Sequence, residues 1–249
     1  APRRDKGDER AEGRERGGGR RVWGERGLVA MYVPIDDISH TGVLWKDSLP
    51  LTTMVFCFLP LYATFRKGLP FQSFWASCSC LTATVYHYCL FEGMEGGAAG
   101  FTMDDLRSFD VIIACYCLGI SLAYLLHSNH PLVLLSVRVV APISMVAMYT
   151  QGAQLFAFAK VLIANTVFIF VGRVVLPSPA EVPVYDFSYL KFAVPCTLLG
   201  LLFFPLPVYM PHMYWLYHSL WHVFIGLALF TCYGFLHTGQ YQTVKQKRR

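Results

Sequence analysis

Two histidines lie four residues apart in the last apolar stretch of the chain. His218 and His222 occur in the segment YWLYHSLWHVFIGLAL, where this spacing places both imidazoles on one face of a helix. Such a pair suits two ligands of one metal ion, but two histidines that hydrogen-bond in a polar seam have the same spacing. Because the chain has 8 histidines, a pair at this spacing also arises by chance. The pair therefore needs support from the rest of the sequence.

His87 and Asp110 supply that support from two other apolar stretches. Three neutral imidazoles are typical of catalytic zinc sites, in which a water molecule takes the fourth position and its pKa falls towards 7. A neighbouring carboxylate orients such a water or exchanges a proton with it, and Asp110 is the candidate for this role. The alternative for Asp110 is a carboxylate stabilised by the dipole at the start of a helix.

The composition shows what kind of element must position these residues. The chain has 249 residues, of which 55% are hydrophobic and 15% are charged, whereas soluble domains have about 25% charged residues. Residues 1–30 hold 15 of the charged residues, which leaves 22 among the 219 that follow. This distribution indicates a membrane protein and argues against a soluble enzyme, a nucleic-acid-binding module or a disordered protein.

Seven apolar runs, each of about 20 residues, follow the charged start. Helices of this length span the hydrocarbon of a bilayer, so we predict an all-α fold, a seven-transmembrane helix bundle with short loops. His87, Asp110 and the His218 pair then fall at helix ends on the same face of the membrane. The predicted spans are 48–65, 69–90, 106–126, 131–150, 153–175, 187–210 and 214–236.

The bundle divides the chain into three parts. We predict a disordered basic leader over residues 1–45, the seven-helix domain over residues 46–238 and a basic tail over residues 239–249. The first methionine is Met31, so residues 1–30 need not belong to the mature protein. Most basic residues outside the leader fall on the side of the membrane that also holds the C-terminus of the chain. This predicts a cytosolic C-terminus and an exoplasmic or lumenal N-terminus, in the plasma membrane or an endomembrane. These basic residues are Arg66, Lys67, Arg173, Lys191, Lys245, Lys247, Arg248 and Arg249.

Three short segments resemble the CREST superfamily of seven-helix membrane proteins, which includes alkaline ceramidases, progestin and adipoQ receptors and myomaker-like proteins. The segments are ATVYHYC around His87, DVIIACYCLG from Asp110 and HSLWH at residues 218–222. The resemblance is greatest to the myomaker branch and its relatives with GPI-directed phospholipase activity. It covers roughly residues 48–240 and does not extend to residues 1–30.

The resemblance implies that His87, His218 and His222 bind Zn²⁺ and that Asp110 contacts the zinc-bound water. Enzymes of the superfamily typically have a serine four residues before the first histidine, where this chain has Ala83. Thr84 shares the helical face of His87 and is the candidate replacement for that hydroxyl. Myomaker also lacks the serine, which leaves a role without catalysis open.

We therefore expect a zinc-dependent membrane hydrolase that cleaves an amide or ester bond in a lipid of GPI type or ceramide-like structure. In this hypothesis Asp110 acts first as general base and then as general acid. The alternative is a non-enzymatic, myomaker-like protein of membrane remodelling or cell fusion, in which zinc braces the helices. A receptor and a haem protein have weaker support, since long coupling loops are not obvious and the carboxylate favours zinc. Membrane lipids are the expected partners, and no nucleic acid is expected.

Two basic residues remain inside the predicted spans. Arg138 and Lys160 each lie about eight residues into their helices, deeper than snorkelling easily accommodates. They either hold a lipid phosphate or headgroup near the histidine site, or pair with backbone carbonyls and other polar groups within the bundle.

Overall fold

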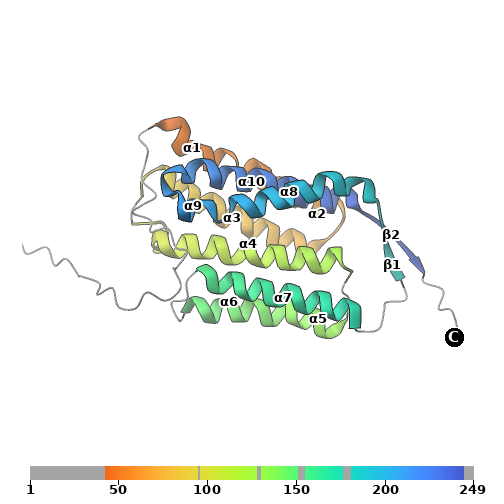
Figure 1. The fold of residues 1–249 in the computed structure, drawn as a ribbon. Helices are drawn as coiled ribbons and strands as arrows, with labels where there is room; N and C mark the ends of the chain where they lie inside the picture. The colour runs from red at the N-terminus through yellow and green to blue at the C-terminus, as the bar shows by residue number, and fades with distance from the viewer. Residues whose placement is uncertain (1–42, 95, 128–129, 151–154, 176–180, 244–249) are drawn as a thin grey trace, which may run out of the picture.

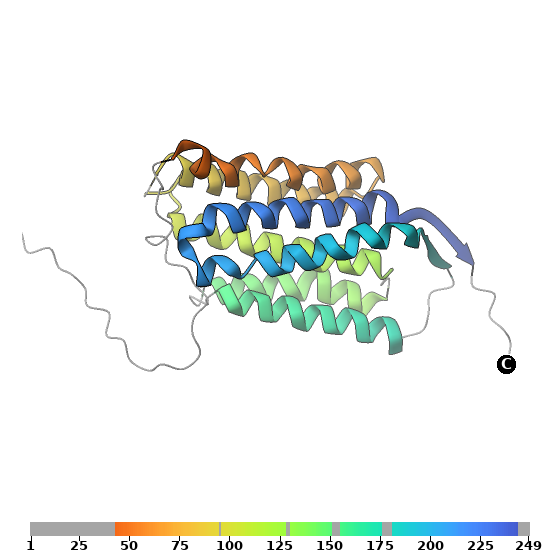
Figure 2. The same cartoon turned by 45° about the horizontal axis from the view of Figure 1, so that its top comes forward.

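The computed structural model describes residues 43–94, 96–127, 130–150, 155–175 and 181–243. These residues are mainly helical, and the helices lie side by side along a common direction in one elongated bundle (Figures 1 and 2). The leader predicted over residues 1–45 lies almost entirely outside the described residues, as does the end of the predicted tail.

The described helices coincide with the seven apolar runs. The first run forms α1 (Leu44–Thr52) together with α2 (Val55–Arg66). The second run forms α3 (Pro70–Phe91), and the third forms α4 (Met103–Leu125). The next two form α5 (Pro131–Leu135), the π-helical turn η2 (Ser136–Val140) and α6 (Ala141–Thr150), and then α7 (Leu155–Val175). The last two form η3 (Phe187–Tyr189), α8 (Leu190–Phe203) and α9 (Leu206–Tyr209), and then η4 (Pro211–Met213), α10 (Tyr214–Thr231) and η5 (Cys232–Leu236).

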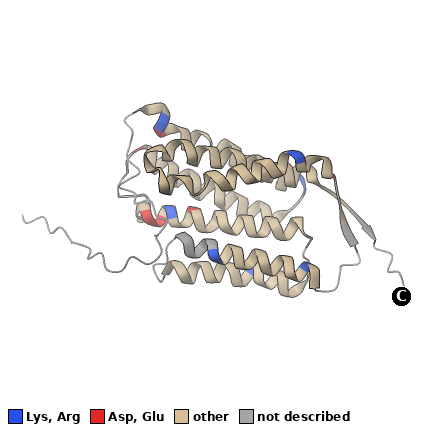
Figure 3. Cartoon of the chain, viewed as in Figure 1, with Lys and Arg blue, Asp and Glu red and all other residues tan. Residues whose placement is uncertain are grey.

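Among the described residues, four helical segments are long and apolar enough to cross a membrane, namely Leu44–Arg66, Met103–Leu125, Pro131–Thr150 and Pro211–Leu236. Charged residues are sparse along the helices (Figure 3). Large apolar side chains cover the outside of the bundle, for instance Phe74, Leu81, Ile143 and Leu198. A soluble protein rarely exposes so much contiguous apolar surface. These features indicate an integral membrane protein and confirm the prediction of a mainly helical fold.

The turn between α1 and α2 places a threonine inside the bundle. Pro50 lies within α1, and Thr53 ends that helix with its hydroxyl bonded to the carbonyls of Leu49 at 2.9 Å and Pro50 at 3.1 Å. The Thr53 amide still donates to the Leu49 carbonyl, but the Met54 amide donates to Leu51 rather than to Pro50. The hydroxyl supplements this weakened ladder, so the helix is interrupted for one turn and the chain then continues as α2. Thr53 is thereby held in one orientation.

The start of α4 is specified by a capping box. The Thr102 hydroxyl accepts a hydrogen bond from the Asp105 amide, and the Asp105 carboxylate accepts one from the Thr102 amide. This reciprocal pair satisfies two backbone donors that the first turn leaves free. It determines where α4 begins, and so places Asp110 two turns into that helix.

The helix α10 lies in the middle of one half of the bundle and packs on α8, α2 and α1. Two glycines allow these approaches. A methyl group on Gly226 would lie 2.4 Å from the Phe56 carbonyl oxygen of α2, and one on Gly200 of α8 would lie 3.3 Å from the Ile225 backbone nitrogen. In the other half, α4 lies between α3 and the pair formed by α6 and α7 (Figure 1).

Two short strands depart from the predicted all-α fold. β1 (Glu181–Tyr185) pairs antiparallel with β2 (His237–Thr243), at the end of the bundle where α10 and η5 finish (Figure 1). Residues 239–243, which the sequence analysis assigned to the tail, therefore form part of a small sheet. The sequences EVPVY and HTGQYQT do not show a clear alternation of apolar residues, and about 50 residues separate them, so nothing local predicts the pairing.

Candidate metal centre

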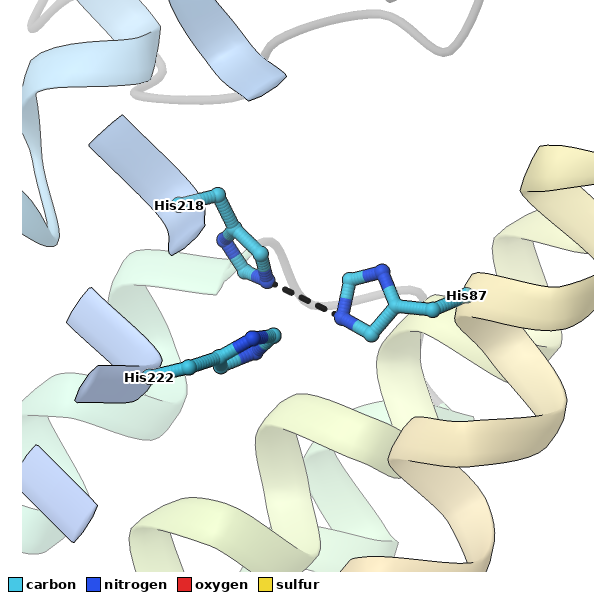
Figure 4. A group of neighbouring side chains, drawn as sticks. All are labelled: His87, His218 and His222. Carbon is cyan, nitrogen blue, oxygen red and sulfur yellow. Dashed lines mark hydrogen bonds between the residues drawn. The ribbon is translucent and has the colours of Figure 1, made fainter. Parts of the chain in front are cut away.

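Three imidazoles from two helices point towards one another inside the bundle. His87 comes from the end of α3, and His218 and His222 come from the first turns of α10 (Figure 4). Each histidine contributes one ring nitrogen to a group in which the three nitrogens lie within 4.8 Å of one another. The Nε2 atoms of His87 and His218 are 3.1 Å apart. Two nitrogens on one tetrahedral zinc ion lie about 3.3 Å apart, so this separation suits two ligands of one ion.

Burial supports the same interpretation. His87 is 2% exposed and His222 is 1% exposed. Within the described part of the chain, the buried atoms Nδ1 of His87 and Nε2 of His222 have no hydrogen-bond partner. A buried polar atom without a partner costs free energy, and such atoms are rare in folded proteins. Because His87 turns its Nε2 towards His218, Nε2 of His222 is the unpartnered atom that a metal ion in the cluster would satisfy. The three side chains therefore fit a bound metal ion.

A hydroxyl group holds His222 in the orientation that a ligand needs. The Nδ1 atom of His222 lies 3.3 Å from Oγ1 of Thr53. The Thr53 hydroxyl directs its own hydrogen to the carbonyls of α1, so it accepts a hydrogen from Nδ1. The Nε2 atom then keeps its lone pair, as metal coordination requires. The sequence analysis did not find Thr53, because no local pattern relates two residues so far apart in the chain.

Two tyrosines flank the other two histidines. The ring of Tyr214 stacks on His218 with centroids 4.8 Å apart, and the ring of Tyr86 lies 4.8 Å from His87. Their hydroxyl oxygens are 3.4 Å apart and link α10 to α3 beside the cluster. The sequence analysis did not select either tyrosine. The spacing of four between Tyr214 and His218 was a signal that placed them on one face.

Asp110 is buried in α4, with 6% of its surface exposed, but its carboxylate does not belong to the group of potential ligand atoms. It interacts electrostatically with the hydroxyls of Tyr86 and Tyr214, and with Arg107 on its own helix. The carboxylate is therefore not a fourth member of the potential ligand group. Its role as general base stays a prediction.

Thr84 presents a hydroxyl inside the bundle. Threonines in helices usually return this group to a carbonyl in the preceding turn, as Thr82 does to Cys78 at 3.0 Å. The Oγ1 atom of Thr84 is buried and has no partner among the described residues. Ala83, where enzymes of the resembled superfamily have serine, is itself 5% exposed. Thr84 therefore offers a hydrogen-bonding group that Ala83 lacks, three residues before His87.

The two basic residues inside the predicted spans do not join the histidines. Arg138 and Lys160 are both exposed on the outside of the bundle. The guanidinium of Arg138 lies over the ring of Phe71, 4.9 Å from the ring centroid, at the opposite end of α3 from His87.

A cavity occupies the interior of the bundle, and the histidines are not among the residues that line it. It encloses about 620 Å³ of empty space, part of which is open to the outside, and it lies between α2, α3, α4 and α10. Trp221 and Ile225 line it next to His222, while aliphatic side chains, small hydroxyls and cysteines form most of the rest. The polar lining residues are Cys57, Thr64, Gln72, Ser79, Cys80, Cys117, Ser121 and Tyr233.

Residues 43–223 match a family described as a protein of unknown function, DUF3522. The match spans 181 of the 249 residues. The chain belongs to this family. The matched region contains His87, His218 and His222 and ends one residue after the last of them, so β2 lies outside it. A comparison with curated proteins gave no match.

Proposed function

We propose that this protein is a zinc-dependent hydrolase that acts on an amide or ester bond of a membrane lipid. The observation that carries the proposal is the buried histidine cluster, in which Nε2 of His222 lacks a partner among the described residues while its Nδ1 lies against Thr53. The resemblance of three segments to the CREST superfamily supports the same chemistry, and a second buried hydroxyl, that of Thr84, is available on the helix of His87.

The proposed membrane arrangement has seven crossings. All seven helical segments lie side by side, although only four meet the length and hydropathy of a membrane span within the described residues. The helix α3 carries serines, threonines and His87, which lower its hydropathy, and of these Ser73 and His87 are buried within the bundle. In this arrangement the C-terminus is cytosolic, and the histidines lie near the exoplasmic or lumenal face.

In the proposed reaction each residue has a separate task. His87, His218 and His222 hold the metal ion, which when bound supplies Lewis-acid activation of water and of the carbonyl group. Asp110 accepts a proton from the attacking water and returns it to the leaving nitrogen or oxygen as the bond to the carbonyl carbon breaks. The Thr84 hydroxyl donates a hydrogen bond to the carbonyl oxygen as negative charge develops there.

The cavity supports a lipid as the substrate. Its walls beside His222 are largely apolar, which suits a hydrocarbon chain, while the small hydroxyls and cysteines deeper in the bundle have partners of their own. A chain lying between α2 and α10 would bring the attached carbonyl group to the histidine end.

Metal content and hydrolysis of the detergent-purified protein test the proposal together. We expect about one zinc ion per chain, lost in His87→Ala and His218→Ala and retained in Asp110→Asn. His130→Ala is the matched control, because His130 caps α5 outside the cluster. Asp110→Asn should abolish lipid hydrolysis while the metal stays bound. A His87→Ala protein that is folded and keeps its full zinc content would disprove the metal site.

A structural role for the metal is the second candidate function. It is favoured by Ala83 in place of serine, and by the origin of the ligands from α3 and α10, two helices that the ion would join. In this case the protein remodels membranes or promotes cell fusion, as myomaker-like proteins do. An Asp110→Asn protein that retains zinc and full cellular activity would support this candidate over the hydrolase.

A further inference from the structure

Arg138 is an exposed cation inside the apolar segment Pro131–Thr150. A guanidinium in contact with hydrocarbon is costly unless it finds a polar or anionic partner. Asp110 is the only carboxylate in the sequence between residues 106 and 180, and it is buried in α4. Among the described residues, the contact recorded for the Arg138 guanidinium is the face of the Phe71 ring. An anion that matches this charge must therefore come from outside those residues.

A break in the helix presents Arg138 at this position. In η2 the Ala141 amide donates to the carbonyl of Ser136, five residues back, instead of four. Pro142 follows, and it has no amide hydrogen to donate to the Arg138 carbonyl. The proline thus explains the wide turn, and π-helical turns of this kind often occur at functional sites.

The contact with Phe71 sets the depth of the guanidinium. Arg138 lies seven residues, or about 10 Å, from the start of its segment, and its long side chain reaches back towards that end. Phe71 is the second residue of α3, so the guanidinium lies at the level of the first turn of that helix. His87 is 16 residues further along α3, about 24 Å away. The cation is therefore at a helix end, in the leaflet opposite to the histidine cluster.

Aromatic rings continue the surface from Phe71 into the bundle. Trp75 lies one turn after Phe71 on α3, and Tyr116 of α4 packs edge-on against it with centroids 4.7 Å apart. The Tyr116 hydroxyl is buried without a partner among the described residues, and it interacts electrostatically with Arg138. The seam between α3, α4 and η2 thus combines an exposed cation, an unsatisfied hydroxyl and an aromatic wall.

We propose that this seam binds the phosphate group of an anionic phospholipid from the surrounding leaflet. Arg138 forms paired hydrogen bonds with the phosphate oxygens, the Phe71 ring holds the guanidinium flat, and Tyr116 donates a further hydrogen bond. With a cytosolic C-terminus this end of the bundle faces the cytosolic leaflet, where anionic lipids are concentrated. Arg66 ends α2 and Lys67 follows it at the same end, and both add positive charge. The site does not depend on the metal.

Lipid retention measured by native mass spectrometry tests the site. The full chain is reconstituted in nanodiscs of phosphatidylcholine in which a fifth of the lipid is phosphatidic acid, and is then released into detergent. Wild-type protein should retain one phosphatidic acid molecule. Arg138→Gln should bind it at least about tenfold more weakly, since a charge-assisted pair of hydrogen bonds is lost. Lys160→Gln is the matched control, because it removes the same charge from an exposed position of α7.

Three further variants separate the contributions to the site. Arg138→Lys keeps the charge without the planar group and should bind a few-fold more weakly. Phe71→Leu should also weaken retention although Arg138 is intact, and Tyr116→Phe should have a smaller effect in the same direction. If Tyr116→Phe retained phosphatidic acid as well as wild type does, the Tyr116 hydroxyl would not be part of the site.

The proposal is overturned if Arg138→Gln, eluting as a single folded peak, retains phosphatidic acid as well as wild type does. It is also overturned if wild type retains phosphatidylcholine equally well, or if inorganic phosphate displaces the lipid and occupies the site instead. Recovery of a protein partner that depends on Arg138, without retained phosphatidic acid, would likewise replace a lipid site with a protein interface.

Discussion

The Nδ1 atom of His222 lies 3.3 Å from the Oγ1 atom of Thr53, although 169 residues separate the two in the chain. Residues that orient a metal ligand in this way typically change metal affinity by 10–100-fold when they are removed. We therefore expect Thr53→Val to weaken zinc binding by about 10–100-fold, measured by competition with a chelator. Thr52→Val is the control, because the Thr52 hydroxyl bonds to Leu49 on the exposed side of α1. Equal affinities in both variants would show that Thr53 does not orient His222.

The free hydroxyl of Thr84 predicts a catalytic effect without an effect on the metal. We expect Thr84→Val to retain zinc and to lower kcat for lipid hydrolysis by about 100-fold, as the loss of one donor to a developing oxyanion does. Thr84→Ser should keep most of the activity. Thr82→Val is the control, since its hydroxyl already bonds to Cys78. Full activity in Thr84→Val would exclude this hydroxyl from the reaction.

The close approach of α10 to α2 predicts a sensitivity to volume at Gly226. A Cβ atom there would lie 2.4 Å from the Phe56 carbonyl oxygen, so the two helices must move apart. We expect Gly226→Ala to lower the free energy of unfolding by about 1–3 kcal/mol, measured by thermal unfolding in detergent. Gly234→Ala should have little steric effect, because the nearest atom to its Cβ lies at 3.9 Å. A stability of Gly226→Ala equal to that of Gly234→Ala would contradict the packing of α10 on α2.

The attachment of β2 to the end of the bundle predicts a dependence on pH. His237 is fully buried at the start of β2, between the rings of Tyr124 and Tyr185, and its Nδ1 accepts a hydrogen bond from the Gly239 amide. Burial lowers the pKa of His237 below its usual 6.5, and the nearby Lys67 ammonium lowers it further. The detached strand then binds more protons than the attached one, so the attachment is stable above pH 6.5 and weakens as the pH falls below that value.

Hydrogen exchange in β2 measures this effect. After correction for intrinsic rates, amides of residues 237–243 should exchange faster below pH 6.5 than above it. His237→Gln should remove the dependence, whereas His130→Gln, at the cap of α5, should leave it unchanged. If amide exchange in β2 still depended on pH in His237→Gln, another titrating group would be responsible for the dependence.

The sequence by itself determined the helices and the grouping of the three histidines. Runs of apolar residues specify helices locally, and a spacing of four specifies one helical face, so His218 and His222 had to lie together. The level of His87 followed from its place at the end of a neighbouring helix. Asp110 was predicted near the same level, but its distance from the ring nitrogens depends on how α4 rotates about its own axis, which spacing does not specify.

Only the tertiary structure decided which other side chains complete these sites. Thr53 faces His222 because α1 ends beside α10, and Phe71 lies under Arg138 because α3 begins beside η2. Neither contact has a signal in the local sequence. The strands β1 and β2 likewise pair across the helices that separate them in the chain. Helix formation depends on neighbours a few residues apart, whereas these contacts depend on the packing of whole helices, and a single sequence does not state that packing.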